Sequence, residues 1–316
     1  MSGWIDYWCN AFSPDRLALW DAAIAAQGLP LKIRRREDDS FTDLEGMLAR
    51  MDELNVATLV LPCGDAPAGA DVTTYELFTT HFEDVLKWSA EHPGRFAGLF
   101  TLNPTSGIAG LRRAAEALGH GCFVGLQIHT HSWDREFDHR DYYPYYALAA
   151  EHGVPVVMQA GASGGRSASE CGRPIGIDRP AIYFGGSGGS GDSGGGGVNF
   201  VLSHTGWPWV EEALAMVGKH PNVFLGTAAF PPHHWSPELL RFIGGPGQGK
   251  VMLGTSFPVV GHRHALARLG EVDLSDQARA LLLEGTARRV FSRLARPPDP
   301  PRLPRPPRAQ NKEEPQ

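Results

Sequence analysis

The sequence predicts a single (β/α)8 barrel. Eight short apolar runs are typical of buried parallel strands, because they are continuously apolar rather than alternating with polar residues. Stretches with helical periodicity separate most of the runs, and repeated alternation of strand and helix indicates a closed barrel rather than an open sheet. A length of 316 residues suits one such domain.

The predicted strands are spaced along the whole chain. They are WIDYW from Trp4, VATLVLP from Val56, RFAGLF from Arg95, FVGLQI from Phe123, VPVVMQ from Val154, VNFVLS from Val198, NVFLG from Asn222 and KVMLG from Lys250. Two amphipathic helices between them are marked by the apolar stripes Phe78, Phe82, Val85 and Leu86, and Val210, Ala213, Leu214 and Val217.

Three segments do not fit this alternation of strands and helices. Residues 10–41 form a long insertion after the first strand, which we expect to be a lid or an added helix. Residues 185–197 (GGSGGSGDSGGGG) have the composition of flexible coil, and no Lys-Ser or Lys-Thr pair follows that would indicate a phosphate loop. Residues 296–316 are rich in proline and predict a disordered tail, so the expected domain is a barrel over residues 1–295.

Composition excludes several classes of function. The net charge is −6 and the isoelectric point is near 6.1, which argues against a nucleic-acid partner. No apolar run approaches the roughly 20 residues that cross a bilayer, and the first residues lack the pattern of a signal peptide. We therefore expect a cytoplasmic protein that does not contact membranes. The four cysteines form no CxxC pair, so neither a zinc knuckle nor a disulfide framework is indicated.

Polar residues gather where the predicted strands end. Catalytic groups of such barrels project from the C-terminal ends of the strands. Those ends carry Trp8, Cys9 and Asn10, then Gln127, His129 and His131, then Gln159, His204, Thr227, Thr255 and Ser256. The aromatic residues on the loops that follow are Trp133, Trp207, Phe230, Trp235 and Phe257. We predict a pocket for a small molecule at this mouth, with an aromatic wall.

Four motifs carry a family resemblance: WIDYWCN, SHTGWPWVEEALAMVGKHPNVFLG, KVMLGTSFP and LSDQARALLLEGTARRVF. Together they resemble the amidohydrolase-related (amidohydrolase-2) family over most of residues 3–294. The resemblance implies the (β/α)8 fold and kinship with metal-dependent hydrolases and with non-oxidative decarboxylases of aromatic or unsaturated carboxylic acids. Related barrels are often dimers, so it also implies a homodimer.

The departures from the family pattern concern the metal. Trp8 and Asn10 stand where the family has its two first-strand histidines, and Gln159 replaces the fifth-strand histidine. Ser256 replaces the eighth-strand aspartate, whereas His204 matches the catalytic histidine of the sixth strand. An indole is no ligand, and neutral amides or a hydroxyl are poor donors for zinc or manganese. We therefore expect no metal and no other cofactor at the family's site.

Three hypotheses follow. The first is a metal-independent hydrolase or carboxy-lyase that acts on a small, aromatic carboxylic compound, with His204 as general acid/base. Its substrate-binding residues are predicted to be Trp8, Asn10, His129, His131, Gln159, Trp207 and Ser256. The second is a barrel that binds a small molecule or a partner without catalysis.

The third hypothesis is a relocated metal site built from His129, His131 and His204, because residues two apart on a strand point to the same face.

Two other features are expected to have structural roles only. Cys9 is expected to be a buried structural thiol, and His262 and His264 are expected to face solvent at the start of a helix.

Overall fold

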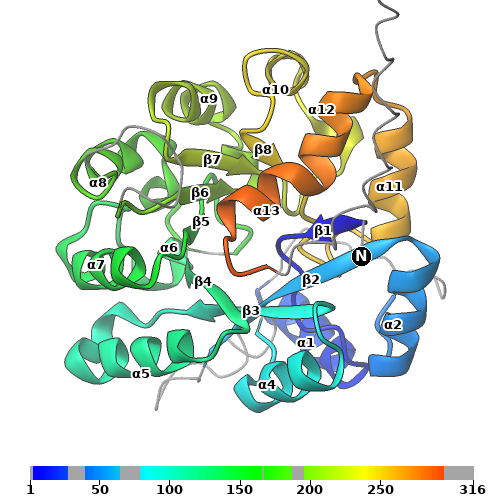
Figure 1. The fold of residues 1–316 in the computed structure, drawn as a ribbon, viewed down its shortest axis with the longest axis horizontal. Coiled ribbons are helices and arrows are strands. Elements are labelled where there is room, and N and C mark those ends of the chain that lie inside the picture. The colour runs from blue at the N-terminus through cyan, green and yellow to red at the C-terminus, as the bar shows by residue number, and fades with distance from the viewer. Residues whose placement is uncertain (1–2, 28–39, 65–78, 166, 187–195, 295–316) are drawn as a thin grey trace, which may run out of the picture.

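The computed structural model describes residues 3–27, 40–64, 79–165, 167–186 and 196–294. Eight parallel strands form one sheet in the order β1 to β8, with helices around the outside (Figure 1). The strands are β1 Trp4–Asp6, β2 Val56–Cys63, β3 Phe96–Thr101, β4 Phe123–Ile128, β5 Val156–Gln159, β6 Phe200–Ser203, β7 Val223–Gly226 and β8 Val251–Met252. All eight predicted strands are confirmed, and so is the (β/α)8 fold.

The helices lie between the strands and after them. They are α1 Asp15–Gln27, α2 Leu44–Glu53, α4 Phe82–Glu91, α5 Gly107–Gly119, α6 Thr130–Trp133, α7 Tyr143–His152, α8 Asp178–Tyr183, α9 Val210–Lys219, α10 Pro237–Gly244, α11 His262–Gly270, α12 Asp276–Ala280 and α13 Thr286–Val290. A π-helical turn, Leu281–Gly285, joins the last two. Within the described residues, no helix is both long enough and apolar enough to cross a membrane.

Hydrogen bonds between the β8 and β1 segments close the sheet into a barrel. The amide of Tyr7 lies 3.4 Å from the carbonyl of Leu253, and the amide of Ser256 donates to the carbonyl of Trp8 at 2.8 Å. Farther along, Cys9 and Phe257 form a parallel bridge. We call this line of contact the seam. It runs beyond β8, which has only two residues, toward the C-terminal mouth of the barrel.

The barrel interior is packed around Tyr7, which has no solvent exposure. The Tyr7 hydroxyl lies 2.6 Å from Ser203 Oγ and accepts a hydrogen bond from the amide of Ala228 at 3.3 Å. Burial, above all, raises the pKa of the phenol. Gly226 and Gly254 face the ring, and a Cβ atom at either position would collide with it. Glycine on β7 and after β8 therefore makes room for a large side chain from the β1 segment.

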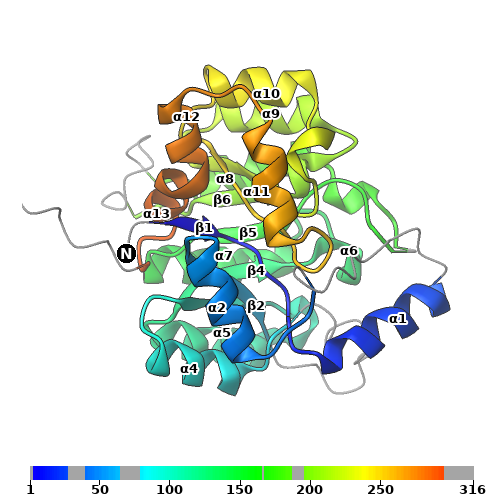
Figure 2. The same ribbon diagram turned by 90° about the vertical axis from the view of Figure 1, so that its right-hand side faces the viewer.

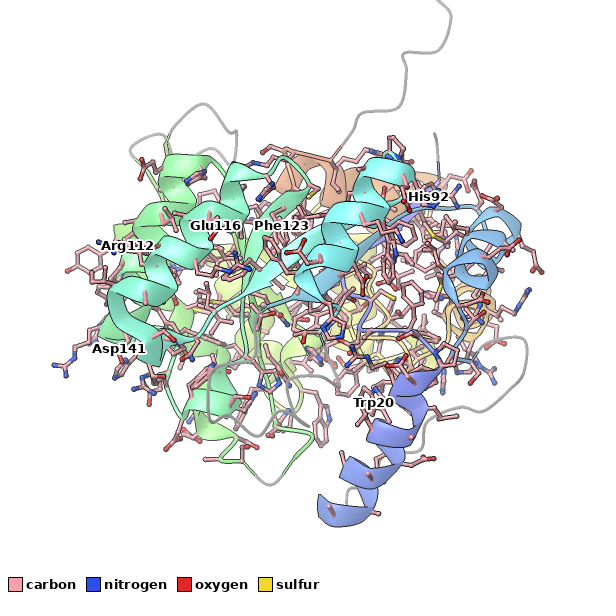
Figure 3. All side chains as sticks on the ribbon, turned by 90° about the horizontal axis from the view of Figure 1, so that it is seen from below. Trp20, His92, Arg112, Glu116, Phe123 and Asp141 are labelled. Atoms are coloured by element: carbon pink, nitrogen blue, oxygen red, sulfur yellow. The ribbon has the colours of Figure 1, made fainter. Side chains whose placement is uncertain are left out.

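The insertion after the first strand contains a helix, as expected. Helix α1 extends away from the body of the barrel (Figure 2). Trp20 anchors it where it meets the body (Figure 3), with 2% exposure and with Phe41 and Val259 packed nearby. Residues 28–39 of the insertion, residues 187–195 of the glycine-rich run and the tail from residue 296 lie outside the described residues.

Gly226→Ala should destabilise the barrel by about 1–3 kcal/mol, because the new methyl group overpacks the Tyr7 ring in a closed interior. Gly218→Ala on α9 is the matched control, since nothing lies within 4 Å of a Cβ there. In that exposed helical position alanine should be neutral or add about 0.5–1 kcal/mol. Urea unfolding measures both. Equal stabilities for the two variants would contradict the account of the interior.

Candidate active site

His204 stands at the C-terminal end of β6. The strand ends at Ser203, and the chain then enters a short 3-10 turn, His204–Gly206. His204 and Thr205 have φ values of 59° and 56°, in the left-handed region that non-glycine residues seldom adopt. Such backbone strain clusters at functional sites. The Nδ1 atom of His204 is buried and has no hydrogen-bond partner within the described part of the chain.

The indole of Trp8 supports the His204 ring from the β1 side. The two ring centroids are 4.9 Å apart and the rings are perpendicular. Trp8 is 2% exposed, so this contact is part of the packed interior. The sequence prediction that the ends of the first and sixth strands meet at one mouth is therefore correct for these two residues.

The strand β4 ends where predicted, and the longer strand on which the relocated metal site depends does not form. His129 and His131 do not share one face of an extended strand, because β4 ends at Ile128 and helix α6 begins at Thr130. The hydroxyl of Thr130 donates to the carbonyl of Gln159 at 2.9 Å, which turns the chain over the end of β5. The two imidazoles nevertheless remain neighbours, with centroids 6.0 Å apart.

Both imidazoles of this pair already have hydrogen-bond partners. His131 is 3% exposed, and its Nε2 lies 3.0 Å from the carbonyl oxygen of Gly161, which requires Nε2 to carry the proton. His129 Nδ1 lies 2.6 Å from Ser132 Oγ. The side chain of Gln159 also bonds to His129. The β4 and β5 ends are thus tied together through His129.

The three histidines are held in their neutral form. Burial, followed by the charge of His131, lowers the pKa of His129 to about 3. Burial, followed by the charges of His129 and His131, lowers the pKa of His204 to about 3. Burial also lowers the pKa of His131, and the Gly161 carbonyl partly offsets this. The three imidazoles at this mouth therefore carry no positive charge at neutral pH.

Three of the four residues that the family resemblance assigns to metal positions bind one another. Trp8 Nε1 donates to Asn10 Oδ1 at 2.8 Å. Asn10 Nδ2 lies 3.2 Å from both the carbonyl oxygen and the hydroxyl of Ser256. Asn10 has no solvent exposure and Ser256 has 4%. The polar atoms of this group are satisfied internally, so it forms a closed hydrogen-bonded wall.

The aromatic wall is smaller than predicted. Trp207 is 53% exposed, and its ring packs on Phe230 with centroids 6.1 Å apart rather than on the imidazoles. Phe257 has no exposure and stacks on His262, and Trp235 is 6% exposed. These last two are core residues, because their rings pack inward against neighbouring elements. Of the predicted binding residues, Trp207 alone stands at the rim.

Sequence reasoning missed a cluster behind the site. Within the described residues, one set of three His, Cys, Asp or Glu side chains has ligand atoms within 4.8 Å of one another: Asp6, Cys9 and His262. The expectation that His262 faces solvent is wrong, since it is 1% exposed and its Nε2 lies 3.1 Å from Asp6 Oδ2. The sequence did contain a signal for this pair: Asp6 lies within the predicted buried strand WIDYW, and a buried carboxylate needs a hydrogen-bond donor as its partner.

Cys9 belongs to the same cluster but behaves as a structural thiol. It has no exposure, and burial raises the pKa of its thiol well above the ordinary value, so the protonated form is favoured. Its sulfur lies 3.5 Å from the carbonyl oxygen of Asn10. This agrees with the prediction from the sequence.

The fold is a (β/α)8 barrel with three histidines at the C-terminal ends of its strands. The sequence model of the amidohydrolase family matches residues 5–193 and 195–293, so this chain belongs to that family. Comparison with curated proteins gives no match.

Solved structures show the same fold. An uncharacterised TIM-barrel protein of Bordetella bronchiseptica is 18% identical with a TM-score of 0.67, over 93% of this chain and 100% of that one. A 2,6-dihydroxybenzoate decarboxylase from Rhizobium is 15% identical with a TM-score of 0.63, over 92% and 99%. The 5-carboxyvanillate decarboxylase of Sphingomonas paucimobilis is 18% identical with a TM-score of 0.60, over 92% and 99%.

The low pKa of His204 should make the protein less stable in acid. Between pH 6.5 and pH 3 the unfolded chain binds a proton at this residue and the folded chain does not, so stability falls as the pH falls through that window. For each pH unit in this window, His204 contributes up to about 1.4 kcal/mol to the loss in free energy of unfolding, and His204→Asn should remove that contribution. Urea unfolding from pH 7 to pH 4.5 measures it. His120→Asn, at an exposed site before β4, is the control and should leave the dependence of stability on pH as in the wild type. If His204→Asn also kept the wild-type dependence, the low pKa assigned to His204 would be refuted.

Proposed function

We propose that this chain is a hydrolase or carboxy-lyase that acts on a small aromatic carboxylic compound without the family's divalent metal, with His204 as general acid/base. One observation carries the proposal: Trp8, Asn10 and Ser256 bond to one another where relatives hold a metal, while His129, His131 and His204 remain together at the mouth. Family membership supports the reaction classes. The printed names of two similar structures, decarboxylases of 2,6-dihydroxybenzoate and 5-carboxyvanillate, support the substrate class.

The residues at the family's metal positions do not fit a divalent ion. None of Trp8, Asn10, Gln159 and Ser256 is anionic or carries an imidazole, the donors that zinc and manganese require. The amide of Asn10 is engaged with Trp8 and Ser256, so a metal would have to break this set.

A relocated metal on the three histidines has less support. The ligand atoms of His129, His131 and His204 do not lie within 4.8 Å of one another in the described residues. His131 Nε2 is directed to the carbonyl of Gly161 and His129 Nδ1 to Ser132. We therefore derive no step through a metal ion.

The proposed mechanism relies on the charge of the substrate. A carboxylate bound among neutral imidazoles raises their pKa values, because an opposite charge favours the protonated form. His204 has a free Nδ1 atom and a ring fixed against Trp8, so it is placed to hold that proton. In decarboxylation the bond from ring carbon to carboxyl carbon breaks, CO2 leaves, and the electron pair on the ring carbon takes the proton from His204. In hydrolysis of an ester, unprotonated His204 accepts a proton from the attacking water as the new carbon–oxygen bond forms, and it returns this proton to the leaving oxygen when the ester bond breaks.

A second candidate is a barrel that binds an aromatic acid without converting it. The observation that favours it is the closed wall of Trp8, Asn10 and Ser256, in which the Trp8 N–H and both the oxygen and the nitrogen of the Asn10 amide are already bonded within the wall. Saturable binding of 2,6-dihydroxybenzoate with no product formed would favour this candidate over the enzyme.

His204→Asn tests the enzyme directly. Protein treated with a chelator is incubated with 2,6-dihydroxybenzoate, 5-carboxyvanillate and related aromatic acids and esters, and products are measured by liquid chromatography and CO2 release. We expect turnover, and a kcat about 10²- to 10⁴-fold lower in His204→Asn because proton transfer is lost. His120→Asn should match the wild type. Turnover that is unchanged in His204→Asn, or that appears only with added manganese, would overturn the proposal.

Restoring the family's donors should restore metal binding. The combined variant Trp8→His, Asn10→His, Gln159→His and Ser256→Asp supplies three imidazoles and one carboxylate at the strand ends. We expect about one equivalent of zinc or manganese in the variant, measured by elemental analysis and calorimetry, and almost none in the wild type. A full equivalent in the wild type that disappears in His204→Asn would instead establish the relocated site.

A further inference from the structure

A buried carboxylate, Asp6, lies directly behind the candidate site and accepts four hydrogen bonds. Its Oδ1 atom accepts from the amides of Trp8 at 3.2 Å and Thr255 at 2.9 Å. Its Oδ2 atom accepts from the hydroxyl of Thr255 at 2.5 Å and faces His262 Nε2 at 3.1 Å. Asp6 has no solvent exposure, so these donors replace its hydration.

Two of these bonds hold the backbone that carries site residues. Trp8 follows Asp6 by two positions, and the Trp8 carbonyl accepts from the amide of Ser256 at 2.8 Å. The hydroxyl of Thr255 also accepts from the amide of Phe257 at 3.0 Å. A shift of the Asp6 carboxylate is therefore transmitted to Trp8 and Ser256, and through the Trp8 indole to His204.

His262 is the donor that reaches Asp6 from outside the seam. It is the first residue of α11, and its ring stacks on Phe257 with centroids 5.1 Å apart and planes at 4°. Trp4 packs against the same ring edge-on at 5.9 Å. The Nδ1 atom of His262 has no hydrogen-bond partner in the described residues, and Nε2 faces a carboxylate oxygen, which only accepts, so Nε2 carries a proton.

We infer that His262 is a positioning residue of this site: by donating Nε2–H to Asp6, it fixes the placement of Trp8 and of the Thr255–Ser256 turn. Neither the sequence motifs nor the family's metal positions include it. The effect of His262 on turnover rests on the proposed function. Its effect on the placement of Trp8 does not.

The first measurement uses the unmodified chain, so it does not depend on whether a variant folds. Long-range ¹⁵N–¹H correlation spectra of the histidine rings report which nitrogen carries the proton. We expect His262, identified by its absence in His262→Gln, to be the Nε2–H tautomer. An Nδ1–H tautomer would overturn the inference, because Nε2 would then be unable to donate to Asp6.

The second measurement follows the indole N–H signal of Trp8 among the eight tryptophans, assigned with Trp8→Phe. His262→Leu removes the donor and should shift the Trp8 signal. His262→Gln keeps an N–H at a similar reach and should restore the wild-type position. His264→Leu, two residues along the same helix and half-exposed, is the control and should leave the signal in place. A folded His262→Leu protein with an unshifted Trp8 signal would overturn the inference.

Function gives the third readout. His262→Leu should weaken binding of 2,6-dihydroxybenzoate or lower kcat by about 10- to 100-fold, since small displacements of positioned groups are costly, and His262→Gln should recover most of it. Equal values for His262→Leu and wild type, with the Trp8 signal shifted, would refute positioning of the reacting groups. If the unmodified chain neither binds nor converts any probe, the proposed function fails while the two spectroscopic measurements still decide the role of His262.

Discussion

The Asp6 carboxylate is the constraint on which the mouth of this barrel depends. The seam between β8 and β1 is the weakest part of the sheet, because β8 has two residues and the ladder continues only as isolated backbone bonds. Asp6 crosses this seam and binds both the amide and the hydroxyl of Thr255. A buried carboxylate that lost a donor would cost far more than an ordinary hydrogen bond contributes. Because Asp6 must keep its hydrogen-bond donors, the backbone is held in place at Trp8 on the β1 side of the seam and at Thr255 on the β8 side.

On the proposed function, charge balance accounts for a mouth that works without a metal. A divalent ion in a buried site is compatible with a nearby carboxylate because each offsets the other. Without the ion, an aspartate at position 256 would be a buried, unpaired charge. Serine at this position avoids that cost and accepts a hydrogen bond from Asn10 instead. The indole of Trp8 fills volume, and its one polar atom is satisfied by Asn10. Each substitution is neutral, and the three remain mutually bonded.

The parts of this structure that were predictable from the sequence are those set by local pattern. Continuous apolar runs identified all eight strands, and parallel strands in a closed barrel necessarily bring their C-terminal ends together. That is why Trp8, Asn10, Ser256 and His204 could be grouped before any coordinates existed. The long insertion of residues 10–41 after the first strand likewise predicted a lid or an added helix, and helix α1 lies within it.

The parts that could not be predicted depend on partners distant in sequence. His262 is buried because Asp6, 256 residues earlier, needs a donor, and helical pattern alone placed it at the surface. The predicted run FVGLQI ends where β4 ends, but a strand long enough to place His129 and His131 on one face does not form, because helix α6 begins at Thr130, whose hydroxyl donates to the carbonyl of Gln159. Phe257 was assigned to the pocket wall, yet the buried ring of His262 provides a stacking surface for it. In each case a contact with residues distant in sequence, rather than the local sequence pattern, determined where the residue lies.

On the proposed function, a proton takes over the electrostatic role that an ion has in related metal enzymes. The three imidazoles at the mouth are neutral, since burial and their mutual repulsion hold the pKa values of His129 and His204 near 3. Such a site gains little from binding a neutral molecule, whereas an aromatic carboxylate brings the charge that makes protonation of an imidazole favourable. Substrate and proton then bind together, and the acid needed for the reaction is formed only when the carboxylate is present. Selectivity for carboxylic compounds would thus follow from the same desolvation that keeps the imidazoles uncharged.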